Sequence, residues 1–259
     1  MLSTLPLEFI GLAHRSADAS GTVIRQYFRT PVAVDDKPDS SPVTIADREA
    51  ERVMRELIQQ AYPQHGIYGE EMGVKNQDAE FVWVLDPIDG TKSFITGKPL
   101  FGTLISLLHH GHPILGMIDQ PITRERWVGG VDLATTLNGQ AVKTRHCADL
   151  SQAILYATTP LMFEGQDKVA FEHLCQQIKL PLYGADCYAY ALLAMGFVDL
   201  VVEADLSPYD YCSHVPIIEQ AGGKITDWQG QALGLSSDGR VVAAGDKALH
   251  QQVLNVLTS

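Results

Sequence analysis

The sequence has few cations for its number of anions. Its 259 residues include 19 Lys and Arg against 31 Asp and Glu, which gives a formal net charge of −12. Binding to nucleic acid or to an anionic membrane surface depends on clustered cations, so we expect neither partner. Hydrophobic residues make up 46% of the chain and charged residues 19%. This balance is typical of a folded globular protein and argues against a disordered chain.

Long apolar runs and paired cysteines are also lacking. The longest stretch without a polar side chain is Cys187–Val198, whereas a membrane-spanning helix needs about 20 apolar residues. Residues 1–14 contain no Lys or Arg, so they lack the basic region of a secretory signal peptide. The cysteines have no C-x-x-C spacing and suggest neither a disulfide framework nor a zinc site. We therefore expect a cytoplasmic protein with four reduced thiols, Cys147, Cys175, Cys187 and Cys212.

Three common catalytic signatures are missing as well. The chain has no G-x-S-x-G elbow, no phosphate-binding loop of the Walker type and no G-x-G-x-x-G. A group of histidines, His109, His110 and His112, lies between two strand-like runs. Adjacent histidines rarely point at one ion, so a solvated turn is favoured there over a metal site.

The first half of the chain is predicted to contain two helices and then an antiparallel meander. Apolar residues recur at helical spacing over 1–28 and most clearly over 46–61, where Thr44 and Asp47 have the spacing of a capping box. Residues 30–43, rich in Pro, Asp and Ser, are predicted to form a loop. Strands and a final hairpin follow, at 81–85, 103–108, 114–119, 125–131 and Asn138-Gly139.

The second half alternates between strand-like and helix-like segments. The strands are predicted at 153–158, 197–203, 224–226 and 241–244, and the helices at 168–178, 185–195, 208–220 and 247–257. Such alternation predicts βαβ crossovers and a mostly parallel sheet. A polar segment at 143–149 suggests two domains, 1–147 and 148–259.

Acidic residues gather where turns would present them. Glu70 and Glu71 follow a glycine, Asp86 and Asp89 end a buried strand, and Asp210 begins a helix. Strand ends and helix starts face the crevice outside a sheet, where ligands bind in α/β proteins. Converging carboxylates repel one another unless a cation joins them, and oxygen ligands without His or Cys suit Mg²⁺, Mn²⁺ or Ca²⁺.

Each acidic segment also has a simpler interpretation. Residues 86–90 have an ordinary turn composition, and Glu70-Glu71 suits a solvated pair. Residues 207–210 suit a helix start with Pro at the first position and a capping Asp. Asp47 is equally explained by the capping box with Thr44. Taken one at a time, the segments leave both interpretations open.

Taken together and in order, the segments resemble the inositol monophosphatase superfamily. The resemblance begins at V-T-x-A-D over 43–47 and continues with G-E-E over 69–71 and W-V-L-D-P-I-D-G-T over 83–91. It ends with Tyr209-Asp210 and E-Q-A-G-G over 219–223. Members are Mg²⁺-dependent phosphomonoesterases, and homodimers are usual. The resemblance implies an α/β fold, a layered α-β-α-β-α sandwich with an antiparallel first sheet and a mostly parallel second one.

The resemblance also implies roles for individual residues. The ligands of two or three Mg²⁺ ions would be Glu70, Asp86, Asp89, Asp210 and the carbonyl of Ile88. The backbone N–H groups of Gly90 and Thr91 would hold the phosphate. Thr91 and Asp47, with Glu70 nearby, would orient and deprotonate the attacking water. One ion would lower the pKa of that water and another would stabilise the leaving alkoxide.

Three further segments resemble the histidinol-phosphate phosphatases of plant and bacterial type. These are D-G-T-K-S-F-I-T-G-K-P over 89–99, G-M-I-D-Q-P with R-E-R-W over 116–127, and D-C-Y-A-Y over 186–190. The chain departs from inositol-type members at Lys92-Ser93, and it has Tyr209 where Trp commonly precedes the metal Asp. The implied reaction is hydrolysis of L-histidinol phosphate, a small phosphate monoester, in histidine biosynthesis. The alternatives are an inositol monophosphatase or a phosphatase of broad specificity for sugar and nucleotide monophosphates.

The charge of this substrate predicts two further site residues. Histidinol phosphate carries an ammonium group and an imidazole, which call for carboxylates outside the metal shell. Asp186 opens a helix and Glu203 ends a strand, so both are predicted to pair with the substrate. For Asp186 the alternative is a favourable charge at a helix N-terminus, worth under about 1 kcal/mol.

Two other expectations concern catalysis as a whole. A binding protein that had lost catalysis should lack part of the metal and nucleophile set, and none of that set is missing, so we expect an enzyme. Lys37 and the serines of the segment 31–42 suit a mobile lid that carries a metal or phosphate contact.

Overall fold

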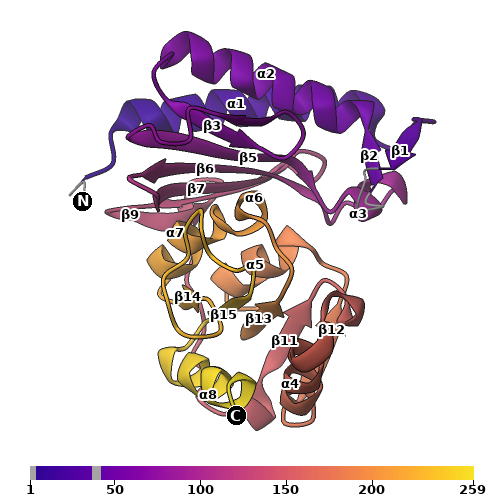
Figure 1. The fold of residues 1–259 in the computed structure, drawn as a ribbon, viewed down its shortest axis with the longest axis vertical. Coiled ribbons are helices and arrows are strands. Elements are labelled where there is room, and N and C mark those ends of the chain that lie inside the picture. Colours follow the sequence, from indigo (N-terminus) through magenta and orange to yellow (C-terminus); the bar gives the residue numbers. More distant parts are fainter. Residues whose placement is uncertain (1–3, 37–41) are drawn as a thin grey trace.

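The protein, described by a computed structural model over residues 4–36 and 42–259, is built from five stacked layers. Within these ranges, two long helices cover an eight-stranded sheet, short helices separate it from a five-stranded sheet, and two more helices close the stack (Figure 1). The α/β class and the α-β-α-β-α sandwich are therefore confirmed. No helix among the described residues is long and apolar enough to cross a membrane.

The first layer consists of α1 (Leu7–Tyr27) and α2 (Ile45–Ala61), which lie side by side on the larger sheet (Figure 1). Their apolar faces pack on Trp83 and Leu85 of that sheet, and both side chains are fully buried. Full burial of each such side chain stabilises the fold by about 1.5–3 kcal/mol.

The segment between these helices is not simply a loop. Residues of β1 (Val34–Asp36) pair antiparallel with β2 (Pro42–Thr44), so the prediction of a loop over 30–43 was wrong there. The β-branched Val34 and Val43 favour this pairing, and Pro42 takes the first position of its strand, where a missing N–H is tolerated. Lys37 lies outside the described residues, so the lid hypothesis stays a prediction.

The larger sheet has the order β10-β9-β8-β7-β6-β5-β3-β4. Its strands are β3 (Gly66–Gly69), β4 (Gly73–Lys75), β5 (Phe81–Asp89), β6 (Gly102–His109), β7 (His112–Gln120), β8 (Glu125–Gly130), β9 (Leu133–Leu137) and β10 (Gln140–Ala141). All neighbours are antiparallel except β3 and β5. The predicted meander and the hairpin at Asn138-Gly139 are confirmed.

The smaller sheet has the order β12-β11-β13-β15-β14. Its strands are β11 (Ile154–Ala157), β12 (Leu180–Tyr183), β13 (Leu200–Glu203), β14 (Lys224–Thr226) and β15 (Val241–Ala244). The first three are parallel, whereas β15 runs antiparallel to both of its neighbours. A mostly parallel sheet was predicted, but only half of the pairings are parallel. The reason is that β14 and β15 are joined by a loop and not by a crossover helix.

The layer between the sheets contains α5 (Cys187–Ala194), α6 (Pro208–Tyr211) and α7 (His214–Gln220), and the outer layer contains α4 (Gly165–Cys175) and α8 (Lys247–Leu257). One helix was predicted over 208–220, and this was wrong. Pro216 has no N–H to bond to the carbonyl of Cys212, so the helix breaks between α6 and α7. The Ser106 hydroxyl donates to that carbonyl instead, at 3.2 Å.

The largest apolar cluster joins the two halves of the chain. It includes Val84 and Trp127 from the larger sheet and Ile217 from α7. The approach is close, because a Cβ atom on Gly116 would lie 1.9 Å from the carbonyl oxygen of Ser213. The division into domains 1–147 and 148–259 stays a prediction.

Candidate active site

The candidate site begins where β5 ends and the short helix α3 (Thr91–Ile95) starts. The pairing of β5 with β6 is interrupted between Asp86 and Asp89, where the strand carries Pro87. One oxygen of Asp86 accepts a hydrogen bond from the N–H of Ile88 at 2.9 Å. This local bond shapes the turn that presents both aspartates to the same crevice.

Three carboxylates meet at this turn. One oxygen from each of Asp86, Asp89 and Asp210 lies within 4.8 Å of the other two. Asp210 comes from α6, where one of its oxygens accepts the N–H of Ser207 at 2.7 Å in a capping box. The capping interpretation is thus confirmed, and the same carboxylate also takes part in the cluster with the other two aspartates.

Glu70 reaches the same place from β3. Its N–H donates to the carbonyl of Leu85 at 3.1 Å, which extends the parallel pairing of β3 with β5. Its side chain is close enough to Asp86 to raise the pKa of that aspartate. The sheet therefore brings Glu70 next to Asp86, although the two are far apart in the sequence.

Two carboxylates of this site, Asp86 and Asp89, resist ionisation when no cation is present. Burial raises the pKa of Asp86 well above its ordinary range, and Glu70, Asp89 and Asp210 raise it further. Burial raises the pKa of Asp89 in the same way, with Asp186 and Asp210 adding to the effect. A divalent cation would offset this repulsion, and a donor set of oxygen atoms suits Mg²⁺.

Asp47 and Thr91 lie beside the carboxylates. One oxygen of the buried Asp47 accepts from the N–H (2.8 Å) and the hydroxyl (2.6 Å) of Thr44, so the capping box is present. The other oxygen lies 3.5 Å from the Thr91 hydroxyl, which is 3.1 Å from the carbonyl of Ile88. Burial raises the pKa of Asp47, against the hydrogen bonds from Thr44. Asp47 therefore caps α2 with one oxygen and faces Thr91 with the other.

Gly90 is required at the start of α3. Its φ is +87°, and a Cβ atom there would lie 3.0 Å from the carboxyl carbon of Asp186. A side chain would thus be strained and would displace Asp186. The N–H groups at the start of a helix have no partner within the helix, which makes those of Gly90 and Thr91 available to a ligand.

Asp186 lies at the wall of a cavity of about 450 Å³. Its carboxylate accepts from the Ser93 hydroxyl at 2.8 Å. Burial raises its pKa, while Ser93, Lys98 and Lys92 act in the opposite direction. Although Asp186 precedes α5, its side chain makes no capping hydrogen bond. The N–H groups of Tyr188 and Ala189 donate to the carbonyls of Ala185 and Asp186, and that of Cys187 donates to the Asp89 carboxylate. A favourable charge at the helix N-terminus needs no such hydrogen bond, so that alternative for Asp186 stays open.

Glu203 lies deeper in the protein. Only 3% of it is exposed, and one oxygen accepts from the N–H (2.8 Å) and hydroxyl (2.6 Å) of Thr158. The other oxygen accepts from the Tyr190 hydroxyl at 2.8 Å. Thr158 lines the cavity that Asp186 also lines, but Glu203 does not. Of the two predicted substrate contacts, Asp186 is therefore the better placed.

Sequence analysis missed a residue that supports the site. The buried Glu51 of α2 accepts from the N–H of Glu71 and of Met72, on the turn that carries Glu70. A signal was present, because Glu51 interrupts the apolar face formed by Ala50, Met54 and Ile58. A charged residue on a buried helical face needs partners, and here they are backbone N–H groups.

The histidines between β6 and β7 lie at the other end of the sheet. Ligand atoms of Glu80, His109 and His110 approach within 4.8 Å of one another, but Glu80 and His110 are exposed. The His109 ring lies 3.2 Å from the Glu80 carboxylate. This contact gives His109 a hydrogen-bond partner and fits the solvated turn that the sequence favours.

Comparison with known proteins agrees with this geometry. The profile of the inositol monophosphatase family matches residues 6–259. The chain is 55% identical over 258 residues to a protein of Arabidopsis thaliana named bifunctional phosphatase IMPL2, chloroplastic, covering 96% of this chain and 75% of that protein. It is 32% identical over 234 residues to a histidinol-phosphatase of Chlorobaculum parvum, covering 90% of each.

A solved structure has the same fold. An inositol monophosphatase from Zymomonas mobilis superposes with a TM-score of 0.91 at 46% identity, covering 99% of this chain and 100% of that one. The superfamily resemblance is therefore confirmed, and with it a phosphatase of metal-dependent type. The carboxylate cluster, the layered fold and the match along nearly the whole chain lead to one conclusion: the protein belongs to the inositol monophosphatase family.

Proposed function

We propose that the protein is a Mg²⁺-dependent phosphomonoesterase that hydrolyses L-histidinol phosphate to L-histidinol and phosphate in histidine biosynthesis. The observation that carries the choice of substrate is the position of Asp186. Its carboxylate lies against Gly90 of the proposed phosphate site and lines the adjacent cavity. An anion in this place suits a phosphate ester that carries an ammonium group or an imidazole. Relatives named histidinol-phosphatase, from three organisms, support the same choice.

The metal-binding part of the proposal rests on the cluster of carboxylates. The proposed ligands of two or three Mg²⁺ ions are Glu70, Asp86, Asp89, Asp210 and the carbonyl of Ile88. Bound there, the ions would neutralise the phosphate dianion and lower the pKa of a bound water. The donor set fits this role because it offers oxygen atoms alone and because close repulsion among the aspartates needs a cation.

The remaining residues of the site would position the reactants and move a proton. The N–H groups of Gly90 and Thr91 donate to the phosphate oxygens. The Thr91 hydroxyl accepts a proton from the attacking water as its own hydrogen passes to Asp47. The water oxygen forms a bond to phosphorus, and the ester P–O bond breaks. Its electron pair goes to the leaving alkoxide, which takes a proton from solvent.

Ser93 and Asp186 would set the specificity. The Ser93 hydroxyl fixes the rotamer of the Asp186 carboxylate by donating to one of its oxygens. The other oxygen then faces the cavity, where it accepts from the cationic part of the substrate. Glu203 lies behind this pair and would act only through Thr158, whose hydroxyl donates to it and which lines the cavity.

Phosphate release from three substrates in parallel tests the proposal. The substrates are L-histidinol phosphate, myo-inositol 1-phosphate and adenosine 3′,5′-bisphosphate, each with Mg²⁺. We expect kcat/KM for histidinol phosphate to exceed the others by about 100-fold, or about 2.7 kcal/mol of differential transition-state binding. A preference for the inositol ester would favour the second candidate, an inositol monophosphatase, which the Zymomonas mobilis structure supports. Comparable rates would favour a phosphatase of broad specificity.

The proposal includes a homodimer in the cytoplasm. Light scattering after gel filtration would then give twice the chain mass of 28.3 kDa. Because the Arabidopsis thaliana relative is named chloroplastic, the compartment needs its own test, by fractionation of the native cells. A mass of a single chain would contradict the homodimer but would leave the proposed phosphatase reaction unchanged.

A further inference from the structure

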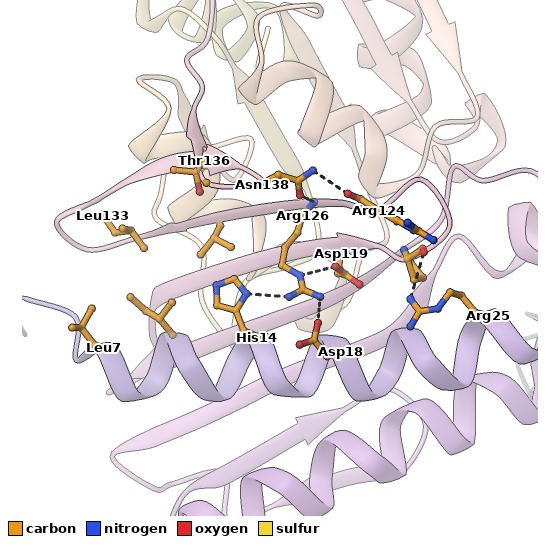
Figure 2. Close-up of a pocket in the computed structure, with 14 residues that line it drawn as sticks. Leu7, His14, Asp18, Arg25, Asp119, Arg124, Arg126, Leu133, Thr136 and Asn138 are labelled. Carbon is orange, nitrogen blue, oxygen red and sulfur yellow. Dashed lines mark hydrogen bonds and ion pairs between the residues drawn. The ribbon is translucent and has the colours of Figure 1, made fainter.

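A second cavity, of about 810 Å³, lies away from the carboxylate cluster, between α1 and the strands β7, β8 and β9 (Figure 2). None of the residues that line it belongs to the proposed metal, phosphate or substrate set. Its volume is within the range of small-molecule sites, which runs from about 300 to 1,000 Å³. The cavity is therefore large enough for a ligand of its own.

One face of α1 forms a wall of this cavity. Leu7, Ile10, His14, Asp18 and Arg25 follow the helical period and extend over about 27 Å. The wall is apolar at the start of the helix and cationic at its end. The opposite wall is also apolar at one end and cationic at the other. Leu133 lies across from Leu7, and Arg124 lies near Arg25 (Figure 2). The cavity is thus amphipathic along its length.

The charged residues at its centre already satisfy one another. Arg126 donates to Asp119 and to Asp18, both at 2.7 Å. A third nitrogen of Arg126 lies 3.0 Å from Nδ1 of His14, and burial lowers the pKa of that histidine. His14 is therefore the neutral acceptor of this contact. Among the described residues, the one cation at the centre of the cavity, Arg126, is therefore already held by these three partners and is not available to a ligand.

The arginines at the cationic end are different. Among the described residues, neither Arg25 nor Arg124 forms an ion pair, and Arg25 makes only long contacts with the Pro121 carbonyl (3.5 Å) and the Thr22 hydroxyl (3.3 Å). Three arginines against two aspartates leave the cavity with one net positive charge, in a protein of net charge −12. This end of the cavity therefore attracts an anion.

Arg124 is held toward the cavity by a defined turn. Its φ is +60°, a conformation that favours glycine. Asn138 stabilises the turn, because its side chain accepts from the N–H of Arg126 at 3.0 Å and donates to the Arg124 carbonyl at 2.9 Å. The chain thus has a long cationic side chain at a position where a glycine would adopt the backbone conformation with less strain.

From this arrangement we propose a second binding site, for a small amphipathic anion. Its single anionic group would lie between the guanidinium groups of Arg25 and Arg124, which recognise carboxylate, sulfate or phosphate oxygens in a bidentate manner. Its apolar body would run past Val128 toward Leu133 and Ile10. At the centre of the cavity Arg126 already pairs with Asp119 and Asp18, so the body would pass there without leaving a charged group unpaired.

Isothermal titration calorimetry with decanoate and with the neutral decan-1-ol tests this site. The variants are Arg25→Ala/Arg124→Ala and, as a matched control, Arg15→Ala, which removes an exposed arginine of the same helix outside the cavity. We expect decanoate to bind the wild type and the control at one site per chain. Decan-1-ol should bind at least about tenfold more weakly, and the double variant should lose at least about tenfold in decanoate affinity.

Several outcomes would overturn the proposal. They are equal binding of decanoate and decan-1-ol, unchanged decanoate affinity in the double variant, and no decanoate binding at about 1 mM. Arg124→Gly, which relieves the left-handed backbone, provides a variant that keeps the fold if the double variant does not. Co-sedimentation with phosphatidylglycerol vesicles that is lost in the double variant would indicate a membrane surface instead. All these measurements are independent of phosphatase activity.

Discussion

The buried carboxylate of Glu51 accepts a hydrogen bond from the backbone N–H of Glu71 at 2.7 Å. Its second oxygen accepts from the N–H of Met72 at 3.0 Å and from Arg55 at 3.1 Å. A Cβ atom on Gly69 would collide with this carboxylate, at 2.1 Å from its oxygen. Glu51 therefore fixes the turn from which Glu70 reaches the aspartates, and both of its oxygens are occupied by hydrogen bonds.

This relationship predicts that Glu51→Gln weakens Mg²⁺ use. A glutamine can accept only with its one carbonyl oxygen, and its NH₂ group would face a backbone N–H, so the turn loses a hydrogen bond and Glu70 shifts. We expect the half-saturating Mg²⁺ concentration to rise about tenfold, equivalent to about 1.4 kcal/mol. Mg²⁺ titrations of activity measure this. Glu56→Gln, on the exposed side of the same helix, is the control, and an equal shift in both variants would exclude the positioning role.

Asp86→Asn should abolish turnover and leave the fold intact. Asn is isosteric and can still accept the N–H of Ile88, but it removes a charge from the proposed metal set. Because burial raises the pKa of Asp86, the metal-free variant should also be more stable than the metal-free wild type at neutral pH. Steady-state kinetics and thermal unfolding in EDTA check both parts. Activity above about 1% of wild type would remove Asp86 from the metal site.

Removal of the metal should make stability depend on pH in a defined direction. The pKa values of Asp86, Asp89 and Asp47 are all raised in the folded protein, so the folded state binds more protons than the unfolded one. The stability of the metal-free protein should therefore fall as pH rises from the unfolded pKa of about 4 through the raised folded values. Urea unfolding in EDTA across this range measures the slope. Saturating Mg²⁺ should reduce the slope, and a rise of stability with pH in EDTA would contradict the argument.

The elements that support this site differ in how far the sequence predicts them. The aspartates and Glu70 could be found because turns, glycines and a buried strand mark them locally. The broken helix at 208–220 could have been predicted too, since Pro216 is visible in the sequence. Strand β12 could not have been predicted, because it contains Pro181, which argues against a strand. It also lies half-exposed at a sheet edge, so its residues do not alternate between apolar and polar. The contact between Asp186 and Gly90 depends on how the two halves of the chain pack, which no local spacing encodes.

Gly90→Ala should damage both the phosphate site and Asp186. The φ of +87° is costly for alanine, and the new Cβ atom would press on the Asp186 carboxylate at 3.0 Å. We expect a loss of about 1–2 kcal/mol in the free energy of unfolding and a fall of kcat by at least about tenfold. Gly73→Ala is a matched control, because its φ is +69° but nothing lies within 4 Å of its Cβ position. Equal effects of both substitutions on kcat would mean that backbone strain alone, and not the contact with Asp186, accounts for the loss.

Asp186→Asn should separate binding of the substrate's cation from the chemistry of its phosphate. The asparagine oxygen can still accept from Ser93, so the side chain keeps its place while the charge is lost. A charged hydrogen bond contributes about 1.5–3 kcal/mol, so KM for histidinol phosphate should rise about 10- to 100-fold. KM for myo-inositol 1-phosphate, which has no cation, should change less than about twofold. Asp205→Asn, in the same cavity but exposed, is the control. If KM for both substrates rises equally in Asp186→Asn, the carboxylate supports the site as a whole and does not recognise the cation.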